Sequence, residues 1–255
     1  MTRALAFGHS QIGALMRGHR SLRSRGEIGY DLNCLGFWEE QYKPLQHSDG
    51  GRMRYNPRVL QDISDAIGQL APDCLIVSIL GAEPYLYGII NDPRPFDFLL
   101  PDQPEFGLSP GTELIPYDLL ARRFRGDLDW QFDIVRSVQE LHRLPMYHIE
   151  APPPVANADL IAAKVYGHFK EKMIEFGRPG VSFRYKVWWL FSQMAKDICA
   201  ELGIIPIDGP PESRDVGGFL AETYFLDGVH GTDEYGALIA REVARAMQSS
   251  GLSGG

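Results

Sequence analysis

Short apolar runs alternate along the chain with segments in which apolar residues recur at spacings of three and four. The apolar runs cover residues 3–8, 74–81, 146–150 and 204–207, and residues 28–37 also have the character of a strand. Runs of this length, bounded by turn-forming residues, predict buried strands. The periodic segments cover residues 11–23, 57–70, 129–143, 158–176, 184–202 and 233–247. Their spacing predicts amphipathic helices.

Capping residues mark several of the predicted helix ends. Asn56 followed by Pro57 is a strong start signal, and Asn157 begins a long helix that Gly177 ends. The stretch that precedes Asn56 shows neither periodicity, so we expect irregular structure up to Tyr55.

Strands and helices alternate five times, which predicts an α/β protein with a doubly wound parallel sheet and helices on both faces. No internal repeat and no domain boundary is evident. We therefore expect residues 1–250 to form a single domain, followed by a flexible Ser/Gly tail over residues 251–255.

Residues 91–126 form an expected insertion within this domain. Its first part, residues 91–111, contains five prolines and three phenylalanines. A loop of this length inside a compact domain is usually functional, for example as a lid. A proline-stiffened flap that packs its own aromatic side chains is an equally good interpretation.

The composition is that of an ordinary folded protein, with 255 residues of which 44% are hydrophobic and 23% charged. The formal net charge of −8 disfavours a nucleic-acid partner and provides no basic patch for a membrane surface. Four arginines near the first helix are interpreted as a solvated helix face, namely Arg17, Arg20, Arg23 and Arg25. The sequence does not indicate an oligomeric state.

The cysteines bear on the cellular compartment. Cys34, Cys74 and Cys199 are odd in number and far apart, which is typical of free thiols in a reducing environment. No charged-then-apolar leader opens the chain, and the apolar run over residues 75–80 is too short to span a bilayer. We expect a cytoplasmic protein.

Ser10 stands at the junction between the first predicted strand and the first predicted helix. The sequence Gly8-His9-Ser10 predicts a tight turn that exposes a hydroxyl beyond the end of the strand. The same turn places that hydroxyl at a helix N-terminus, where free N–H groups favour developing negative charge. A serine at this position is more often only a helix cap, so a nucleophile needs further support.

Other chemical groups follow the ends of the other strands, where α/β proteins bind their ligands. Asp227 and His230 lie between the last strand and the last helix, and glycines bracket them. A hydroxyl, an imidazole and a carboxylate on one edge of a sheet suit acyl transfer. In that chemistry His230 takes the proton from Ser10, and Asp227 holds the imidazole in the required tautomer.

Gly8-His9-Ser10 near the N-terminus and Asp227-Gly-Val-His230 near the C-terminus resemble the SGNH (GDSL-type) hydrolases, whose corresponding blocks are Gly-Asp-Ser and Asp-x-x-His. The resemblance extends to the order of elements over nearly the whole chain. It implies a flavodoxin-like three-layer α/β/α sandwich with a five-stranded parallel sheet. It also implies a serine hydrolase with Ser10 as nucleophile, His230 as base and Asp227 as the residue that orients the base.

The resemblance further implies an oxyanion hole, to which we assign Ser10, Gly36, Gly81 and Ala82. The family's third block supplies an asparagine directly after the third strand. This chain instead reads Gly81-Ala82-Glu83-Pro84-Tyr85 there, and Asn91 comes too late to replace it. Losing one oxyanion donor typically costs a factor of about 10²–10³ in rate.

Four further side chains are predicted to contact substrate: His9, Trp38, Glu83 and Tyr85. A salt bridge within a loop is an equally good interpretation of Glu83, and aromatic core beneath loops is the more common explanation of the two aromatic residues. At least one of Trp188 and Trp189 belongs to the core of a periodic helix. The remaining histidines share no metal-ligand spacing, so we expect neither a metal nor a cofactor.

The sequence thus predicts an esterase that cleaves a small acyl ester through an acyl-enzyme. An O-acetyl group on a sugar or another polar metabolite is a natural substrate by analogy with the family. Two alternatives stay open. An O-acyltransferase would pass the acyl group from the same triad to a bound alcohol, and a degenerate member would bind a ligand without catalysis.

Overall fold

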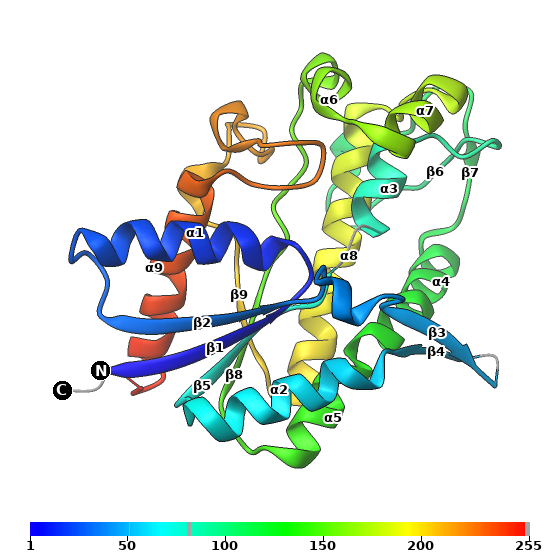
Figure 1. The fold of residues 1–255 in the computed structure, drawn as a ribbon. Coiled ribbons are helices and arrows are strands. Elements are labelled where there is room, and N and C mark those ends of the chain that lie inside the picture. Colours follow the sequence, from blue (N-terminus) through cyan, green and yellow to red (C-terminus); the bar gives the residue numbers. More distant parts are fainter. Residues whose placement is uncertain (51, 81–82, 253–255) are drawn as a thin grey trace.

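The five predicted strands form one parallel sheet in the order β2-β1-β5-β8-β9 (Figure 1). The computed structural model describes residues 1–50, 52–80 and 83–252, without the side chains of residues 52 and 83–85. The strands of the sheet are β1 (Thr2–Gly8), β2 (Tyr30–Gly36), β5 (Cys74–Ser78), β8 (Met146–Ile149) and β9 (Ile205–Ile207). The predicted α/β class and its parallel sheet are confirmed.

Helices cover both faces of this sheet, which gives the three layers of an α/β/α sandwich. Helix α1 (Gln11–Ser24) packs beside α9 (Asp233–Ser249), and α2 (Pro57–Leu70) packs beside α5 (Asp133–Leu141). The chain passes from β1 to β2 on one side and then returns past β1 to β5 on the other side. Because both connections are right-handed crossovers made in opposite directions across the sheet, α1 and α2 lie on opposite faces. Figure 1 shows α1 above the sheet and α2 below it.

The predicted helix caps have the expected geometry. The side chain of Asn56 accepts the N–H of Arg58 at the start of α2, with Pro57 as the first helical residue. The Asn157 side chain accepts two N–H groups at the start of α6 (Ala158–Lys164). Helix α8 (Val181–Leu202) ends at Gly203 in the left-handed conformation, φ +67°, which glycine adopts without steric cost. Its Trp188 is buried, as expected of a core residue.

The expectation of irregular structure up to Tyr55 is wrong. An antiparallel hairpin of β3 (Gln46–Asp49) and β4 (Arg52–Tyr55) precedes α2 and extends away from the main sheet (Figure 1). The residues of β3 are polar and largely exposed, so no alternation of apolar and polar residues marked the strand.

The single long helix expected after Asn157 is also wrong. The segment divides into α6 and α7 (Gly167–Phe176), with Val165 extended between them and Gly167, the first residue of α7, at φ +60°. Phe169 lies at the apolar spacing of the predicted helix, yet it is 38% exposed. Apolar spacing alone does not reveal such a break, because the two short helices continue the same period.

Helical structure before residue 133 differs from the expectation as well. The helix predicted over residues 129–143 begins at Asp133 as α5, and α4 (Tyr117–Asp129) precedes it across a 3₁₀ turn over residues 130–132. Helix α3 (Glu83–Ile89) was not predicted. Both unpredicted helices are short or strongly polar, so their periodic signal is weak.

The predicted insertion is anchored to α8 at its base. Strands β6 (Phe96–Asp97) and β7 (Glu113–Leu114) pair within it. Lys186 of α8 forms a fully buried ion pair with Asp97, 2.6 Å, and also donates to the carbonyls of Phe98 and Gly107. These contacts fix the first part of the segment. Movement of the remainder as a lid stays a prediction.

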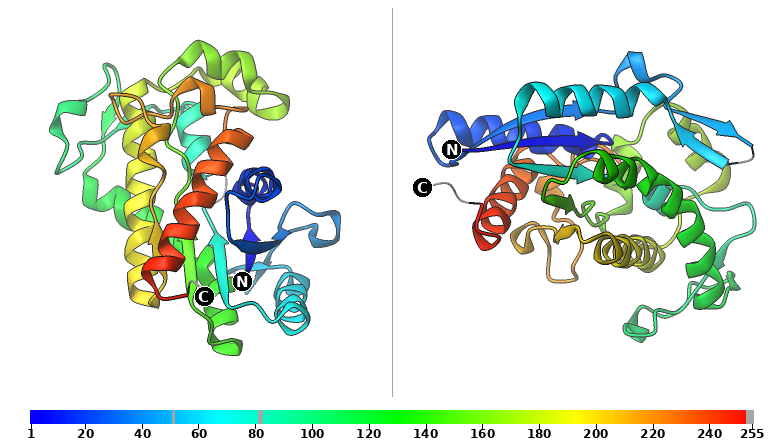
Figure 2. Two further views of the ribbon diagram at one scale, coloured as in Figure 1. Left: turned by 90° about the vertical axis from the view of Figure 1, so that its left-hand side faces the viewer. Right: turned by 90° about the horizontal axis from the view of Figure 1, so that it is seen from below.

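The two ends of the described chain lie side by side in both views of Figure 2. The Thr2 hydroxyl donates to the Leu252 carbonyl at 2.7 Å. The start of β1 and the segment after α9 therefore meet at the N-terminal end of the strands, whereas Ser10 emerges at the C-terminal end.

Candidate active site

The turn that carries Ser10 requires glycine. Gly8, the last residue of β1, has φ +144°, and a Cβ there would lie less than 3.0 Å from the backbone of Ser78 in β5. The N–H of His9 donates to the Ser78 carbonyl at 2.9 Å. This close approach of β1 to β5 turns the chain sharply, so that Ser10 emerges at the start of α1 with an exposed side chain.

Ser10 occupies the N-cap position of α1 without acting as a cap. Its hydroxyl makes no hydrogen bond to the N–H groups of the first turn. The Oγ atom instead lies 2.6 Å from Nε2 of His230, a residue 220 positions away in the chain. The interpretation of Ser10 as a helix cap therefore does not describe its side chain.

His230 is held by Asp227 within a tight loop that precedes α9. Nδ1 of His230 lies 2.7 Å from Oδ1 and 2.9 Å from Oδ2 of Asp227. Oδ1 also accepts the N–H groups of Val229 and His230 at 3.3 and 3.1 Å. A carboxylate at Nδ1 assigns the proton of the neutral ring to that nitrogen, which leaves Nε2 free to accept from Ser10.

The electrostatics of Asp227 suit this role. Partial burial acts to raise the pKa of its carboxyl group. The hydrogen bond and charge of His230 and the two N–H groups outweigh that effect and keep the pKa below its ordinary value. The carboxylate is therefore ionised at neutral pH and could stabilise a positive charge on His230.

Close packing of α1 on α9 brings these two segments together. A Cβ at Gly18 would lie less than 3.0 Å from backbone atoms of Gly236 and Ala237, and one at Gly236 would overlap the Ala14 carbonyl. The two helices thus touch backbone to backbone. Ser10 precedes one of them and His230 precedes the other, so this contact sets the distance between the two side chains.

Gly36 lies beside the Ser10 turn, at the end of β2. It pairs with Gly8 across the sheet, and a Cβ there would overlap the indole of Trp38. Trp38 itself is 45% exposed. The predicted oxyanion glycine and the predicted substrate-binding indole are therefore in direct contact.

The other predicted site residues are placed less completely. Gly81 and Ala82 lie outside the described residues. The backbone of Glu83 and Tyr85 belongs to α3, but their side chains also lie outside the described part of the chain. Their assigned roles stay predictions.

His9 faces an aromatic group rather than the triad. Its Nε2 lies 3.0 Å from the hydroxyl of Tyr55, and its ring packs edge-on against Phe37. Burial lowers the pKa of His9 to about 4, so the imidazole is neutral at pH 7. Trp130 packs against Tyr55 and continues this aromatic group. Contact between His9 and substrate stays a prediction.

Cysteine chemistry is disfavoured at this site. All three cysteines are free thiols, and burial raises the pKa of Cys34, Cys74 and Cys199 to about 12. A thiol with such a pKa is a poor nucleophile at neutral pH. Within the described residues no group of His, Cys, Asp and Glu could hold a metal ion, and no helix there is long and apolar enough to cross a membrane.

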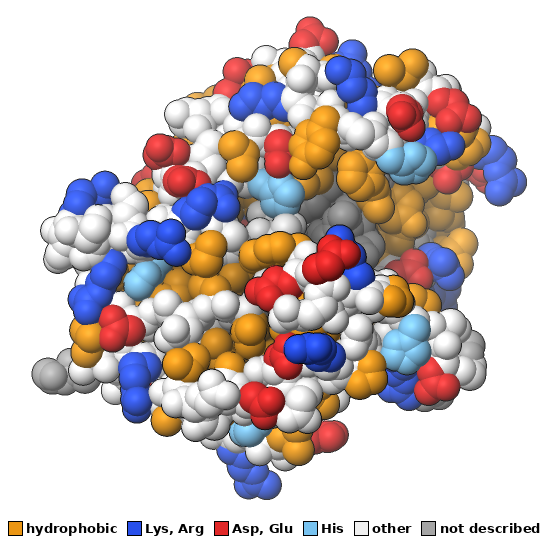
Figure 3. Space-filling view, viewed as in Figure 1, with side chains coloured by type: hydrophobic (Ala, Val, Ile, Leu, Met, Phe, Trp, Pro, Cys, Tyr) orange, Lys and Arg blue, Asp and Glu red, His pale blue; other side chains and the backbone are white. Residues whose placement is uncertain are grey.

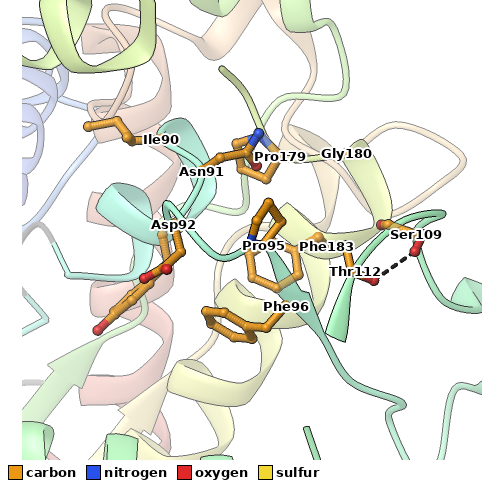
Figure 4. A pocket seen from close by; sticks show the side chains of 11 residues that line it. Ile90, Asn91, Asp92, Pro95, Phe96, Ser109, Thr112, Pro179, Gly180 and Phe183 are labelled. Atoms are coloured by element: carbon orange, nitrogen blue, oxygen red, sulfur yellow. Dashed lines mark hydrogen bonds between the residues drawn. The ribbon is translucent and has the colours of Figure 1, made fainter. Parts of the chain in front are cut away.

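Ser10 is exposed, so the hydroxyl of the triad is open to solvent. Figure 3 shows this face of the molecule hollowed between α3, α6 and α7 above and the β3–β4 hairpin below. A separate cavity of about 40 Å³ lies farther out in the fold, where Asn91 and Pro95 face Pro179 and Phe183 of the α8 end (Figure 4). None of the triad residues lines it, so it is not the reaction site.

One contact at the triad was not foreseen from the sequence. The side chain of Gln11 donates from Nε2 to the Val229 carbonyl at 2.7 Å. The partners are 218 residues apart, and a glutamine in the first turn of a helix carries no signal of such a bond. The Gly18–Gly236 contact was also not predicted, because its two residues are far apart in the chain and neither carries a local signal of the contact.

Comparison with known proteins supports the fold. No family model and no curated protein matches the chain. A solved structure of a candidate acylhydrolase from Bacteroides fragilis matches with a TM-score of 0.50 and 12% identity, over 98% of this chain and 88% of that one. A GDSL-like lipase from Bacteroides thetaiotaomicron matches with a TM-score of 0.48 and 10% identity, over 98% and 89%.

At such low identity the comparison establishes the fold alone. The protein belongs to the class of three-layer α/β/α sandwiches, and it carries a Ser-His-Asp arrangement at the carboxyl edge of the sheet. The fold implied by the SGNH resemblance is therefore confirmed.

Proposed function

We propose that this protein is a serine hydrolase of the SGNH type that cleaves a carboxylic ester without a cofactor. The observation that carries the proposal is the 2.6 Å contact between Ser10 Oγ and His230 Nε2, with Asp227 bound to the opposite ring nitrogen. His230 is thus within hydrogen-bond reach of both the nucleophile and the orienting carboxylate.

The proposed reaction has two halves. In the first, Ser10 Oγ attacks the ester carbonyl while His230 Nε2 takes the hydroxyl proton, and the resulting imidazolium returns a proton to the departing alcohol. In the second, His230 removes a proton from water, which attacks the acyl-enzyme, and the proton then restores the Ser10 hydroxyl as the acid leaves. Asp227 stabilises the imidazolium in both halves.

The negative charge on the tetrahedral intermediate needs hydrogen-bond donors. The backbone N–H groups of Ser10 and Gly36 are the donors that we assign among the described residues, with support from the N-terminal end of the α1 dipole. Gly81 and Ala82 complete the proposed oxyanion hole. Because the family asparagine is missing from the sequence, we expect a slower chemical step than in a site with that amide.

The proposed substrate is a small acyl ester, such as an O-acetyl group on a sugar or another polar metabolite. The exposed indole of Trp38, in contact with Gly36, provides a flat apolar surface beside the reacting carbon on which a sugar ring can stack. His9 and the adjacent aromatic side chains offer a neutral wall. Glu83 and Tyr85 are proposed as further substrate contacts.

Two other functions are less well supported. An O-acyltransferase would need to keep water from the acyl-enzyme, whereas Ser10 is exposed. A ligand-binding protein without catalysis would have no need for the assembled contacts of Ser10, His230 and Asp227.

The free thiols are typical of a reducing compartment, and we propose the cytoplasm.

A fluorophosphonate probe together with p-nitrophenyl acetate tests the proposal. We expect covalent labelling at Ser10 and ester hydrolysis, both lost in Ser10→Ala and His230→Ala. A folded parent protein that neither labels nor hydrolyses the ester would contradict it. Adding an acceptor alcohol distinguishes hydrolysis from transfer, because a transferase would form the acylated alcohol in place of the free acid.

A further inference from the structure

The loop over residues 226–230 carries the proposed base and is closed by its own hydrogen bonds. Its outward-facing groups bind neighbouring segments. The N–H of Leu226 donates to the His230 carbonyl at 2.9 Å, and the Asp227 side chain accepts the N–H groups of Val229 and His230. The carbonyl of Val229 points out of the loop toward α1. A group on α1 that binds this carbonyl can therefore hold the loop in place relative to Ser10.

Gln11 binds that carbonyl from the first turn of α1. Residues 10 and 11 of one segment thus meet residues 230 and 229 of the other through two adjacent contacts, Ser10 Oγ to His230 Nε2 at 2.6 Å and Gln11 Nε2 to the Val229 carbonyl at 2.7 Å. Only the first can take part in proton transfer. The second holds the register of the two segments.

The opposite side of the loop lies against other elements. A Cβ at Gly228 would lie less than 3.0 Å from the side chain of Val165, which follows α6, and Lys164 donates to the Phe225 carbonyl at 2.8 Å. The loop is thus held between the α6 end on one side and Gln11 on the other. Removing Gln11 takes away the side-chain hydrogen bond that joins this loop to the residue next to Ser10.

Gln11 has a cost that a purely packing side chain would avoid. The residue is only 7% exposed, and its Oε1 atom is buried with no hydrogen-bond partner among the described residues. Burying an unpaired amide oxygen is unfavourable, and an apolar side chain of equal length would fill the same space without that cost. A glutamine at this position is therefore best explained by the need for its N–H donor.

From these contacts we infer that Gln11 is a positioning residue, which holds the His230 loop so that Nε2 meets the Ser10 hydroxyl. The inference rests on the proposed serine hydrolase function. Gln11 does not contact the reacting atoms and acts through His230. Since small misplacements of reacting groups cost large factors in rate, its loss affects turnover more than folding.

Gln11→Met and Gln11→Glu test this role, with Gln139→Met as the matched control. Gln139 also donates from Nε2 to a backbone carbonyl, that of Leu202, at 3.0 Å, but it joins α5 to the end of α8. We expect Gln11→Met to lower kcat by about 10- to 100-fold with KM changed by less than about twofold and an unchanged melting temperature. Gln11→Glu, which has the size of glutamine but cannot donate when ionised, should lose at least as much.

The NMR resonance of the Nδ1 proton of His230 provides a readout without turnover. We expect a sharp downfield signal in the parent and in Gln139→Met, and a shifted or broadened one in both Gln11 variants. Parent-like kcat and resonance in Gln11→Met, or equal losses in Gln139→Met, would overturn the inference. If the parent neither labels nor hydrolyses esters, the proposed function fails, and the resonance alone then decides the role of Gln11.

Discussion

Gly18 in α1 lies against Gly236 in α9 so closely that neither position has room for a methyl group. Contacts between helix backbones of this kind leave no flexible side chain that can yield. The two residues are far apart in the chain, yet their contact fixes the separation of the segments that carry Ser10 and His230.

Replacing Gly236 with alanine should therefore damage both the fold and the proposed reaction. We expect Gly236→Ala to destabilise the protein by about 1–3 kcal/mol or more, because overpacking must push the helices apart. The same displacement moves His230 from Ser10, so esterase activity should fall while the protein is still folded. Urea unfolding and initial rates measure the two effects.

Gly68→Ala is the control for that substitution. Gly68 lies within α2, and a Cβ there would meet nothing within 4 Å. Alanine in an open helix interior should stabilise by about 0.5–1 kcal/mol with unchanged activity. A Gly236→Ala protein as stable and active as this control would contradict the close contact.

Asp227→Asn should reduce kcat by about 10⁴-fold with little change in KM, because an amide can hold the His230 ring in the wrong tautomer. Asp215→Asn is matched to it, since Asp215 also accepts two backbone N–H groups in a turn, those of Gly217 and Phe219, but has no histidine partner among the described residues. The control should keep parent activity. Equal kcat values for the two variants would argue against a role for Asp227 in catalysis.

The half-buried imidazole of His9 should make the folded state sensitive to acid. Its pKa is about 4 when folded and 6.5 ordinarily, so the unfolded chain binds the proton more readily. Stability should then be unaffected above pH 6.5 and should fall as the pH drops from 6.5 toward 4, by up to a few kcal/mol, on the order of 3, from this residue.

Denaturant unfolding of the parent and His9→Gln between pH 4 and 8 measures that contribution. Glutamine cannot titrate but can still bond to Tyr55, so the pH dependence of stability should be shallower in this variant. His168→Gln serves as the control because its side chain is 72% exposed. If His9→Gln and the parent lose stability in parallel, the protonation of His9 is not the cause.

Lys186→Met should destabilise the protein by about 3–5 kcal/mol, because it leaves the Asp97 carboxylate buried without its cation. Hydrogen exchange should accelerate first in residues 96–109, which this ion pair joins to α8. Lys172→Met removes an exposed ion pair with Glu175 instead and should cost less than about 1 kcal/mol. Similar losses in the two variants would show that the buried pair has no special role.

Local signals in the sequence were sufficient for most of the framework. Four of the five strands are mainly apolar runs, and β2 alternates apolar with polar residues. Helices α1, α2, α8 and α9 have clear apolar faces or caps, so each of these elements could be predicted from its own residues. The β3–β4 hairpin and α4 could not be predicted in this way, because their residues are mainly polar and their formation depends on contacts with the rest of the fold. The break between α6 and α7 was hidden because apolar spacing continues across it.

By itself the sequence determined the α/β class, the glycine turn that exposes Ser10, and the short spacing that joins Asp227 to His230. All three depend on neighbours within a few residues. Only the tertiary structure decided that Gly18 meets Gly236, that Ser10 meets His230 and that Gln11 meets Val229. Each of these contacts joins segments more than 200 residues apart, and which helix packs on which is set by sheet order and side-chain volume across the whole molecule.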